Sequence, residues 1–424
     1  MSVPIVENPM KILIINSRQV KNVGDRAIIT CMIDQARSTF PGCEIVIASG
    51  EAADCRRYFP DVRVVPGVFD NEAAGEIQAA AAVRHLFPPG GSSIKTAGVR
   101  IFHAYLYAVA SLRLRFGNEL PAVLHEYRRA DLILSAGGDF LSESYGTPVP
   151  ILREIALAHQ IGKPVVLYAQ SVGPFFPKHL KYVRKILNKV SLIIARDRET
   201  VELLNGYRIT APIEQTADSV IPLSPQADAA ALAARNGVGK RTIGFALISQ
   251  SHSQIPESLY RSYLLGMRDL VNHAKSIGFE PLLLIASPMD LPATQEVAEM
   301  CGISMPIMNG WEQESGALKA LLSEIRCIVS SRMHPIIIAT SAGVPAIGIG
   351  KMFKMRNYLQ MIGLEQYYLP LDNFNIDRAR KMLEVVARDE GVIRLALRNN
   401  VRRVAALSER NMGLVRDRYR HGNA

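Results

Sequence analysis

An arginine and a histidine lie two positions apart between a strand-like run and a helix-like run. Arg332 and His334 follow the apolar run Cys327–Ser330 and precede the run Ile336–Ser341. This order predicts that both side chains lie at the carboxyl end of a parallel strand, where open α/β sheets bind their ligands. Arginine offers a fixed fork for a carboxylate or phosphate, and histidine exchanges a proton near neutral pH. The stretch therefore predicts an anion site with an acid/base group, although a lone histidine can also cap a helix or pack in a core.

Each of the remaining candidate residues also follows a predicted strand. Asp25 fits equally well as a ligand contact or as the N-cap of the next helix, because aspartate is a preferred capping residue. Arg196 is either a second anion ligand or a surface partner of Asp197. Glycines at such turns let a ligand approach the backbone or simply form a tight turn. The candidates at strand ends are Asn22, Gly24, Asp25, Gly137, Gly138, Asp139, Ser171, Gly173 and Arg196.

Short β-branched runs alternate with helical patterns along the chain, which predicts βαβ units and parallel sheets. One series extends from Lys11–Ile15 to Ile213–Gln215, and a second from Thr242–Ile248 to Ala346–Ile349. The segment Ser224–Lys240, rich in alanine, glycine and polar residues, is interpreted as the connection between them. We therefore expect an α/β fold with two Rossmann-like domains facing a cleft.

The expected first domain covers residues 1–224 and the second covers residues 225–424. Within the first, residues 67–129 are interpreted as an insertion. Its loop Pro88–Ser93 does not match a phosphate-binding loop, because no Gly-Lys-Ser/Thr sequence follows. In the second, the arginine-rich segment Ile376–Arg420 predicts long helices with a solvated face, or a helix that crosses back to the first domain.

Composition limits the classes of partner. The formal net charge of +10 favours an anionic partner, and the chain has no basic tract interleaved with aromatics, so nucleic acid is not expected. The apolar run Ile101–Leu114 is too short to span a bilayer. It predicts a buried or half-buried helix, or alternatively a basic amphipathic surface that contacts a membrane.

Cysteine usage and the first residues indicate the compartment. The five cysteines form no C-x-x-C pair, and Met1–Pro9 lacks the pattern of a signal peptide, so a reducing, cytoplasmic location is expected. No cluster of histidine, aspartate and glutamate has metal-ligand spacing. We therefore expect neither a metal nor a resident cofactor.

The motifs at the strand ends also carry a resemblance when they are taken in order. They are Asn22–Asp25, Gly137–Asp139, Ser171–Phe175, Ala195–Asp197, Ala217–Asp218, Ser331–His334 and Gly343–Pro345. This ordered set resembles the polysaccharide pyruvyl transferase family, over roughly Lys11 to Leu364. The resemblance implies a fold similar to two-domain GT-B glycosyltransferases. It also implies transfer of the enolpyruvyl carbons of phosphoenolpyruvate onto a sugar as a cyclic ketal, most like bacterial exopolysaccharide members of the colanic acid type.

The resemblance implies roles for particular residues. Arg332 and His334 match the family's Ser-Arg-Leu-His motif, which is linked to donor binding and proton transfer, and Arg196 matches an Arg-Asp position linked to the donor. Lys354 matches a retained lysine and is expected to contact the donor, unless it is a surface lysine. Ser171 and Gly173 are also expected at the donor, and the loops at Asn22–Asp25 and Gly137–Asp139 on the acceptor or cleft side. The sequence departs from the family pattern at Ala136, Pro335 and Lys351.

The chemistry supports the same assignment. Phosphoenolpyruvate carries a carboxylate and a phosphate, so bidentate contacts from Arg332 and Arg196 would fix its orientation. A ketal forms when the methylene carbon is protonated, a hydroxyl attacks C2, and a second hydroxyl closes the ring as phosphate leaves. His334 would serve as the acid/base, a contribution of roughly 10²- to 10⁴-fold.

Three functions follow as hypotheses. The first is a cytoplasmic pyruvyl transferase that uses phosphoenolpyruvate as co-substrate. Its acceptor would be a glycan, such as a lipid-linked oligosaccharide at the inner face of the plasma membrane. The second is a GT-B glycosyltransferase that uses a nucleotide sugar, because fold alone does not separate the two. The third is a catalytically silent homologue that binds glycan or partner proteins.

Overall fold

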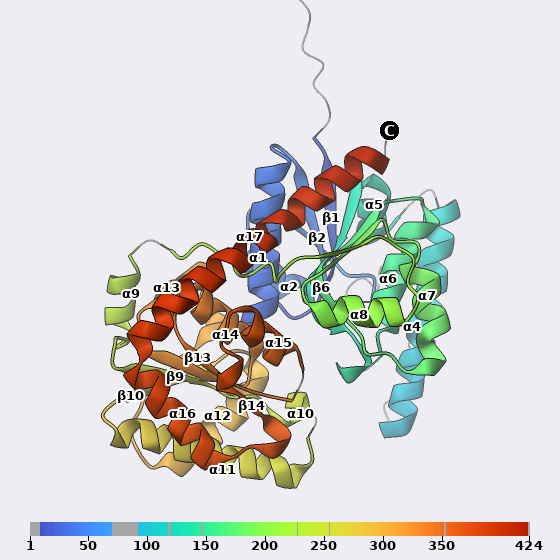
Figure 1. Cartoon of the computed structure of the whole chain (residues 1–424). Helices are drawn as coiled ribbons and strands as arrows, with labels where there is room; N and C mark the ends of the chain where they lie inside the picture. The colour runs from blue at the N-terminus through green and yellow to red at the C-terminus, as the bar shows by residue number, and fades with distance from the viewer. Residues whose placement is uncertain are drawn as a thin grey trace, which may run out of the picture. The chain divides into compact units, whose positions relative to one another are not determined.

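The chain forms two compact units, each built on one parallel β-sheet (Figure 1). The computed structural model describes residues 9–69, 92–117, 120–145, 147–226, 228–253, 255–351 and 353–422. Unit 1 contains Met32–Thr216, the residues up to Val20 and those from Asn411 onward. Unit 2 contains Lys21–Cys31 and Ala217–Arg410. The expected α/β fold with two parallel-sheet domains is confirmed.

The boundaries of the units differ from the expected ones. The division falls after Thr216 instead of after residue 224, and Lys21–Cys31 belongs to unit 2 although it lies early in the sequence. The predicted connection Ser224–Lys240 contains a helix, α9 (Ala229–Arg235), in unit 2. Alanine is the best helix former, and the Asp228 side chain caps this alanine-rich helix by accepting from the amide of Ala231. The composition that suggested a linker therefore encodes a short helix.

Unit 1 has a parallel sheet in which the strand order reverses once. The order is β3-β2-β1-β4-β6-β7-β8, and β5 pairs with β6. The central strands β1, β4, β6 and β7 are almost entirely buried, as expected for a parallel sheet covered on both faces, whereas β8 at the edge is largely exposed. The strands are β1 (Lys11–Ser17), β2 (Glu44–Ser49), β3 (Arg63–Pro66), β4 (Leu132–Ser135), β5 (Gly138–Leu141), β6 (Val165–Val172), β7 (Leu192–Ala195) and β8 (Ile213–Gln215).

Helices α4 to α7 contribute apolar residues to one core cluster with this sheet. The helices of this part of the chain are α1 (Val23–Thr39), α2 (Ala52–Tyr58), α4 (Ser92–Phe116), α5 (Ala122–Arg129), α6 (Val149–Gln160), α7 (Leu180–Leu187) and α8 (Arg198–Gly206). Helix α4 includes the predicted run Ile101–Leu114, and it is half-buried: Leu106 and Ala110 lie in the core, whereas Phe116 is exposed. The loop Pro88–Ser93 lies mostly outside the described residues. Among the described residues, no helix is long and apolar enough to cross a membrane.

Unit 2 has a six-stranded parallel sheet of the order β11-β10-β9-β12-β13-β14. This is the 3-2-1-4-5-6 order of dinucleotide-binding folds, and the order reverses between β9 and β12. The strands are β9 (Thr242–Ala246), β10 (Glu280–Ile285), β11 (Ile307–Asn309), β12 (Cys327–Ser330), β13 (Ala346–Gly350) and β14 (Tyr368–Pro370). The register places Val329 beside Phe245, and Ser330 beside Ala246, at the carboxyl ends of the two central strands.

Helices lie on both faces of this sheet, with α11, α12 and α16 below it and α13 and α14 above it in Figure 1. They are α10 (Gln250–Ser253), α11 (Glu257–Ser276), α12 (Leu291–Cys301), α13 (Ser315–Ser323), α14 (Met333–Ser341), α15 (Phe353–Met361), α16 (Ile376–Arg388) and α17 (Glu390–Gly422). The long helices predicted for Ile376–Arg420 are therefore present. Helix α17 belongs to unit 2 as far as Arg410 and to unit 1 from Asn411.

Candidate active site

The predicted arginine follows β12, at the point where the strand order of unit 2 reverses. Helix α14 begins at Met333, three residues earlier than the expected Ile336. The helix includes Pro335 in its first turn, a position where proline is tolerated because the missing N–H would have no intrahelical partner. Arg332 is thus the N-cap residue, and His334 lies within the first turn of the helix.

Arg332 is held by a buried aspartate that the sequence reasoning missed. Its Nε donates to Asp290 Oδ2 at 2.8 Å, and its Nη2 donates to Asp290 Oδ1 at 2.5 Å. The aspartate is fully buried and the arginine is 6% exposed. Such a bidentate pair fixes the plane of the guanidinium and leaves Nη1 outside the pair. The fork that was expected to hold a ligand therefore already holds Asp290 with two of its three nitrogens.

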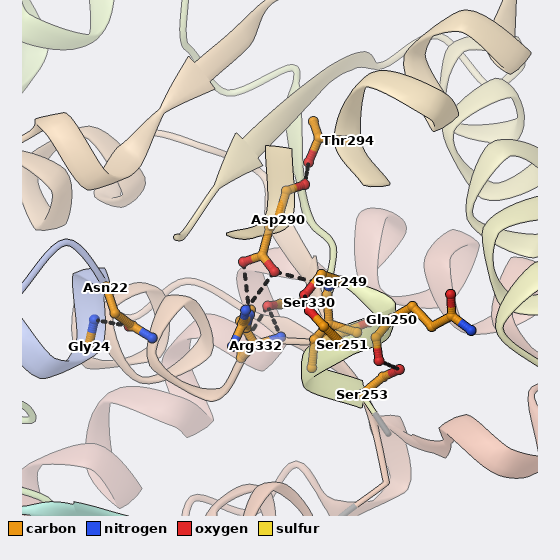
Figure 2. A network of polar contacts seen from close by, with 12 residues as sticks. Asn22, Gly24, Ser249, Gln250, Ser251, Ser253, Asp290, Thr294, Ser330 and Arg332 are labelled. Carbon is orange, nitrogen blue, oxygen red and sulfur yellow. Dashed lines mark hydrogen bonds and ion pairs between the residues drawn. The ribbon is translucent and has the colours of Figure 1, made fainter. Parts of the chain in front are cut away.

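Asp290 precedes α12, in the segment that follows β10. The amide of Ser249 donates to its Oδ1 at 3.0 Å, and the hydroxyl of Thr294 donates to its backbone oxygen (Figure 2). Burial raises the pKa of Asp290, and the Arg332 guanidinium opposes that rise. The strand-end rule that found Arg332 would also have found Asp290, since it lies just after the predicted strand Pro281–Ala286.

His334 lies between a glycine and a second buried aspartate. Its Nε2 is 3.8 Å from Asp218 Oδ2, and the two side chains are 14% and 3% exposed. A Cβ built on Gly24 would lie 2.0 Å from His334 Nδ1, so the imidazole packs directly against the glycine backbone. A residue with a Cβ would therefore clash with the imidazole at position 24. The His334 ring is confined between Gly24 on one side and Asp218 on the other.

The segment that carries Gly24 is fixed to unit 2 by several hydrogen bonds. The Asn22 side chain caps α1 by accepting from the amide of Gly24 at 2.9 Å, and Val23 donates to the carbonyl of Ala286. Arg26 is buried and donates to the backbone oxygens of the segment 310–313. Asn22 and Gly24 were expected in the first domain, in a loop on the acceptor or cleft side; the structure assigns both to unit 2, with Gly24 against the His334 ring.

The N-cap interpretation of Asp25 is wrong. Helix α1 begins at Val23, so Asp25 lies inside its first turn, and the capping bond comes from Asn22. A carboxylate in the first turn is still favourable, because it faces the positive end of the helix dipole. Asp25 is partly exposed.

Asp218 is positioned from two directions. Its Oδ1 accepts from the amide of Val220 at 2.9 Å, and its backbone oxygen accepts from Ser408 Oγ on α17 at 2.7 Å. The nearby Lys319 is buried and donates to the carbonyl of Leu223 at 2.6 Å, and burial lowers the pKa of this lysine to about 8. The sequence showed Asp218 as part of a motif without assigning it a role. Its pairing with His334 needed the three-dimensional structure.

The expected donor lysine, Lys354, is buried, which excludes the alternative of a surface lysine. It lies in α15 and is 3% exposed, with its Nζ 5.9 Å from the centre of the Phe353 ring. Lys351, where the family pattern has a tyrosine, is exposed.

The remaining donor candidates form a separate network in unit 1. Arg196 Nε donates to Ser171 Oγ at 2.8 Å, and that hydroxyl donates to Asp197 Oδ2 at 2.5 Å. Asp197 also caps α8 by accepting from the amide of Thr200. The alternative of Arg196 as a surface partner of Asp197 is wrong, because the arginine is only 3% exposed and reaches Asp197 through the serine.

The predicted glycine turns of unit 1 have clear structural roles. Gly138 has φ +126° and Gly173 has φ +84°, backbone conformations that L side chains rarely adopt. Gly137 and Gly138 lead into β5, and Asp139 is partly exposed in that strand. The amide of Gly173 donates to the carbonyl of Leu141, at the end of the same strand.

A buried carboxyl group lies at the reversal point of the unit 1 sheet, and no motif in the sequence pointed to it. Glu154 on α6 accepts from the amide of Asn16 at 3.2 Å, and the Asn16 side chain donates to Ser135 Oγ at 3.1 Å. Asn16 and Ser135 lie at the carboxyl ends of β1 and β4. Burial raises the pKa of Glu154 to about 7, although the charge of Arg18 opposes the rise. Glu154 therefore titrates near neutral pH in the folded protein.

The chemical capacity of unit 2 follows from these contacts. An oriented guanidinium, an imidazole beside a carboxylate and the amino end of a helix occur together after β12. These groups suit an anionic ligand and a proton transfer. Among the described residues, no group of three or more histidine, cysteine or acidic side chains is arranged to hold a metal ion.

A family model described as polysaccharide pyruvyl transferase matches residues 22–350, which is most of the chain. The chain therefore belongs to the polysaccharide pyruvyl transferase family, a family of transferases that modify polysaccharides. The comparison with curated proteins finds no match.

The solved structures that resemble the chain include GT-B glycosyltransferases and epimerases. A glycosyltransferase from Rickettsia africae aligns with a TM-score of 0.57 at 13% identity, covering 97% of this chain and 99% of that one. The spinosyn rhamnosyltransferase SpnG aligns with a TM-score of 0.55 at 14% identity, covering 96% and 99%. The UDP-GlcNAc 2-epimerase from Methanocaldococcus jannaschii aligns with a TM-score of 0.54 at 11% identity, covering 89% and 93%. At such identities the likeness shows the fold alone, and it confirms the GT-B-like architecture.

Proposed function

We propose that this protein transfers the enolpyruvyl group of phosphoenolpyruvate to two hydroxyls of a sugar, forming a cyclic ketal in exopolysaccharide biosynthesis. One observation carries the proposal. The His334 imidazole is confined between Gly24 and the buried Asp218 carboxylate, two residues after an arginine whose orientation is fixed. This arrangement supports proton exchange next to a bound anion, which is what the reaction requires.

The reaction can be written with His334 as the proton carrier. The imidazolium protonates the methylene carbon of phosphoenolpyruvate, and C2 becomes open to attack by the first sugar hydroxyl. The imidazole then accepts the proton of that hydroxyl, so the carrier is restored. The second hydroxyl then attacks C2, and the C2–O bond to phosphate breaks. The proton of the second hydroxyl leaves with the phosphate. The products are the ketal and inorganic phosphate, and none of these steps requires a metal or a resident cofactor.

The proposed binding residues come from both units of the chain. Arg332 would orient the donor with help from Lys354 in unit 2, and Arg196, Ser171 and Gly173 are the proposed donor-binding residues of unit 1. The loop Gly137–Asp139 would lie on the acceptor side. The acceptor would be a glycan, such as a lipid-linked oligosaccharide at the inner face of the plasma membrane. Asn22, Gly24 and Asp25 would shape the surroundings of His334.

The experiment is to compare His334→Ala with the wild-type protein. We expect the variant to bind phosphoenolpyruvate in a calorimetric titration, because the Arg332–Asp290 pair remains intact. Phosphate release and ketal formation with a panel of glycan acceptors should fall by about 10²- to 10⁴-fold, the usual contribution of a general acid/base. His125→Ala is the matched control, because His125 is half exposed on α5 of unit 1.

The outcomes separate the proposed function from its alternatives. Full activity of His334→Ala would contradict the proposed role of the histidine. Tight binding of a nucleoside diphosphate with no binding of phosphoenolpyruvate would indicate a glycosyltransferase. Failure of the wild-type protein to bind either donor would indicate a non-catalytic homologue.

A further inference from the structure

A serine-rich segment lies at the same reversal point as Arg332, and no role has been assigned to it. It follows β9 and contains Ser249, Ser251 and Ser253, the first of which lies just before the short helix α10. Strands β9 and β12 are neighbours in the sheet, and ligands of open α/β sheets bind outside the carboxyl ends of the strands where the order reverses. The segment and Arg332 therefore extend from the two strands that define this position.

The segment is tied to the arginine through Asp290. The amide of Ser249 and the Arg332 guanidinium both donate to this carboxylate, so one buried group sets the positions of both (Figure 2). Ser249 Oγ lies 3.2 Å from Ser251 Oγ, and the two hydroxyls can each donate or accept. Ser249 is 7% exposed and Ser251 is exposed, so the pair of hydroxyls leads from the buried ion pair to the surface of the unit.

The donors and acceptors here are matched to a phosphoryl group. Asp290 has both oxygens occupied and is fully buried, so its negative charge is offset by Arg332. What remains for a ligand are hydrogen-bond donors: the hydroxyls of Ser249 and Ser251 and Nη1 of Arg332. Three phosphate oxygens can accept from several such donors at once, and hydrogen bonds to a charged group are roughly twice as strong as neutral ones. A methyl or vinyl group would leave these donors unsatisfied.

We infer that Ser249 and Ser251, together with Nη1 of Arg332, form the subsite for the phosphoryl group of the donor substrate. The inference rests on the proposed function, because it takes phosphoenolpyruvate as the donor whose phosphoryl group is bound. The diphosphate of a nucleotide sugar has the same chemistry, and the experiment below distinguishes the two sources. Asp290 acts as a positioning residue, because its carboxylate binds both the Arg332 guanidinium and the amide of Ser249 and so fixes their relative positions.

The test removes the hydroxyls and measures binding of three probes by calorimetry. The probes are phosphoenolpyruvate, inorganic phosphate and pyruvate, which has the carboxylate but no phosphate. For Ser251→Ala and for the Ser249→Ala/Ser251→Ala double variant, affinity for phosphoenolpyruvate and phosphate should fall about tenfold for each hydroxyl lost. Pyruvate affinity should not change. The control is Ser262→Ala, which removes an exposed serine hydroxyl of α11 that bonds within its own helix.

Each outcome decides either the subsite or the proposed function. Unchanged phosphoenolpyruvate affinity in the double variant would overturn the subsite and leave the pyruvyl transferase proposal standing. An equal loss for pyruvate would also overturn it, because the hydroxyls would then hold the carboxylate. If the wild-type protein binds uridine diphosphate but not phosphoenolpyruvate, and the double variant weakens that binding, the subsite stands and the proposed function fails. Because Ser251 is exposed, its single variant tests the inference even if the buried Ser249 proves necessary for folding.

Discussion

The buried Glu154 gives the stability of unit 1 a specific dependence on pH. Burial raises the pKa of this carboxyl group from its ordinary value of 4.5 to about 7 in the folded protein. The folded state therefore keeps its proton over a range in which the unfolded state has already released it. Stability falls as the pH rises wherever the folded state binds more protons. The contribution of Glu154 is thus constant below pH 4.5, decreases between about pH 4.5 and pH 7, and is constant again above pH 7.

The magnitude follows from the two pKa values. Each pKa unit of difference corresponds to about 1.4 kcal/mol, so a difference of about 2.5 amounts to about 3 kcal/mol. Glu154→Gln keeps the shape of the side chain, and its carbonyl can still accept from the amide of Asn16. The variant removes only the titration. The free energy of unfolding of the variant, relative to wild type, should therefore increase by about 3 kcal/mol between pH 4.5 and pH 8.

Urea unfolding at a series of pH values measures this difference. With an m value of about 2 to 3 kcal/mol/M, the variant midpoint should rise by about 1 to 1.5 M relative to wild type across the range. Circular dichroism follows both units, whereas fluorescence of the single tryptophan, Trp311, reports on unit 2, which serves as an internal reference. Other titrating groups of unit 1, such as His159, cancel in the comparison because both proteins contain them.

The matched control is Glu202→Gln, which removes an exposed carboxylate on α8 of the same unit. Its stability relative to wild type should stay constant within a few tenths of a kcal/mol. The reasoning about Glu154 is refuted if the difference between wild type and Glu154→Gln is the same at every pH. Such a result would mean that this carboxyl group titrates alike in the folded and unfolded states.

Two further predictions concern unit 2. Gly24→Ala should reduce kcat/KM for ketal formation by about 10²-fold or more, because the new Cβ would occupy the position of the His334 ring. The control is Gly391→Ala, which has open space around the new Cβ and should leave the rate unchanged. Equal rates for both variants would show that the His334 ring need not pack on Gly24. Asp290→Ala should destabilise unit 2 by about 3 to 5 kcal/mol, measured by urea unfolding with tryptophan fluorescence, because it leaves the buried charge of Arg332 without a partner. A loss below about 1 kcal/mol would indicate that water compensates the guanidinium.

Most of the strands that sequence patterns predicted are buried on both faces, although the predicted strand β8 (Ile213–Gln215) is largely exposed. Strand β12 is buried along its whole length and has the predicted bounds Cys327–Ser330. Strands β5, β11 and β14 were not predicted. Each has only three or four residues, and none shows a β-branched pattern, as in Ile307–Asn309 and Tyr368–Pro370. Their extended conformation depends on pairing with a neighbouring strand, which is information from elsewhere in the chain.

In the candidate site, too, local sequence patterns located some residues but did not find their long-range partners. The strand-end rule located Arg332 and His334, because their position depends on a local order of elements. Their partners Asp290 and Asp218 lie 42 and 116 positions earlier, and only the topology of unit 2 brings each pair together. The assignment of Gly24 to unit 2 likewise depends on the long-range contacts of its segment.

The two arginines expected to bind the donor share a feature that the net charge of the chain does not reveal. Arg332 pairs directly with Asp290, and Arg196 reaches Asp197 through the hydroxyl of Ser171. A buried guanidinium without a counter-ion would cost several kcal/mol, so each aspartate makes the burial tolerable and fixes the orientation of its arginine. The same aspartates offset the charge that would otherwise attract an anion. Affinity at these arginines should therefore come from hydrogen bonds made by donors that are already oriented, with little entropy lost on binding, and it should depend only weakly on salt.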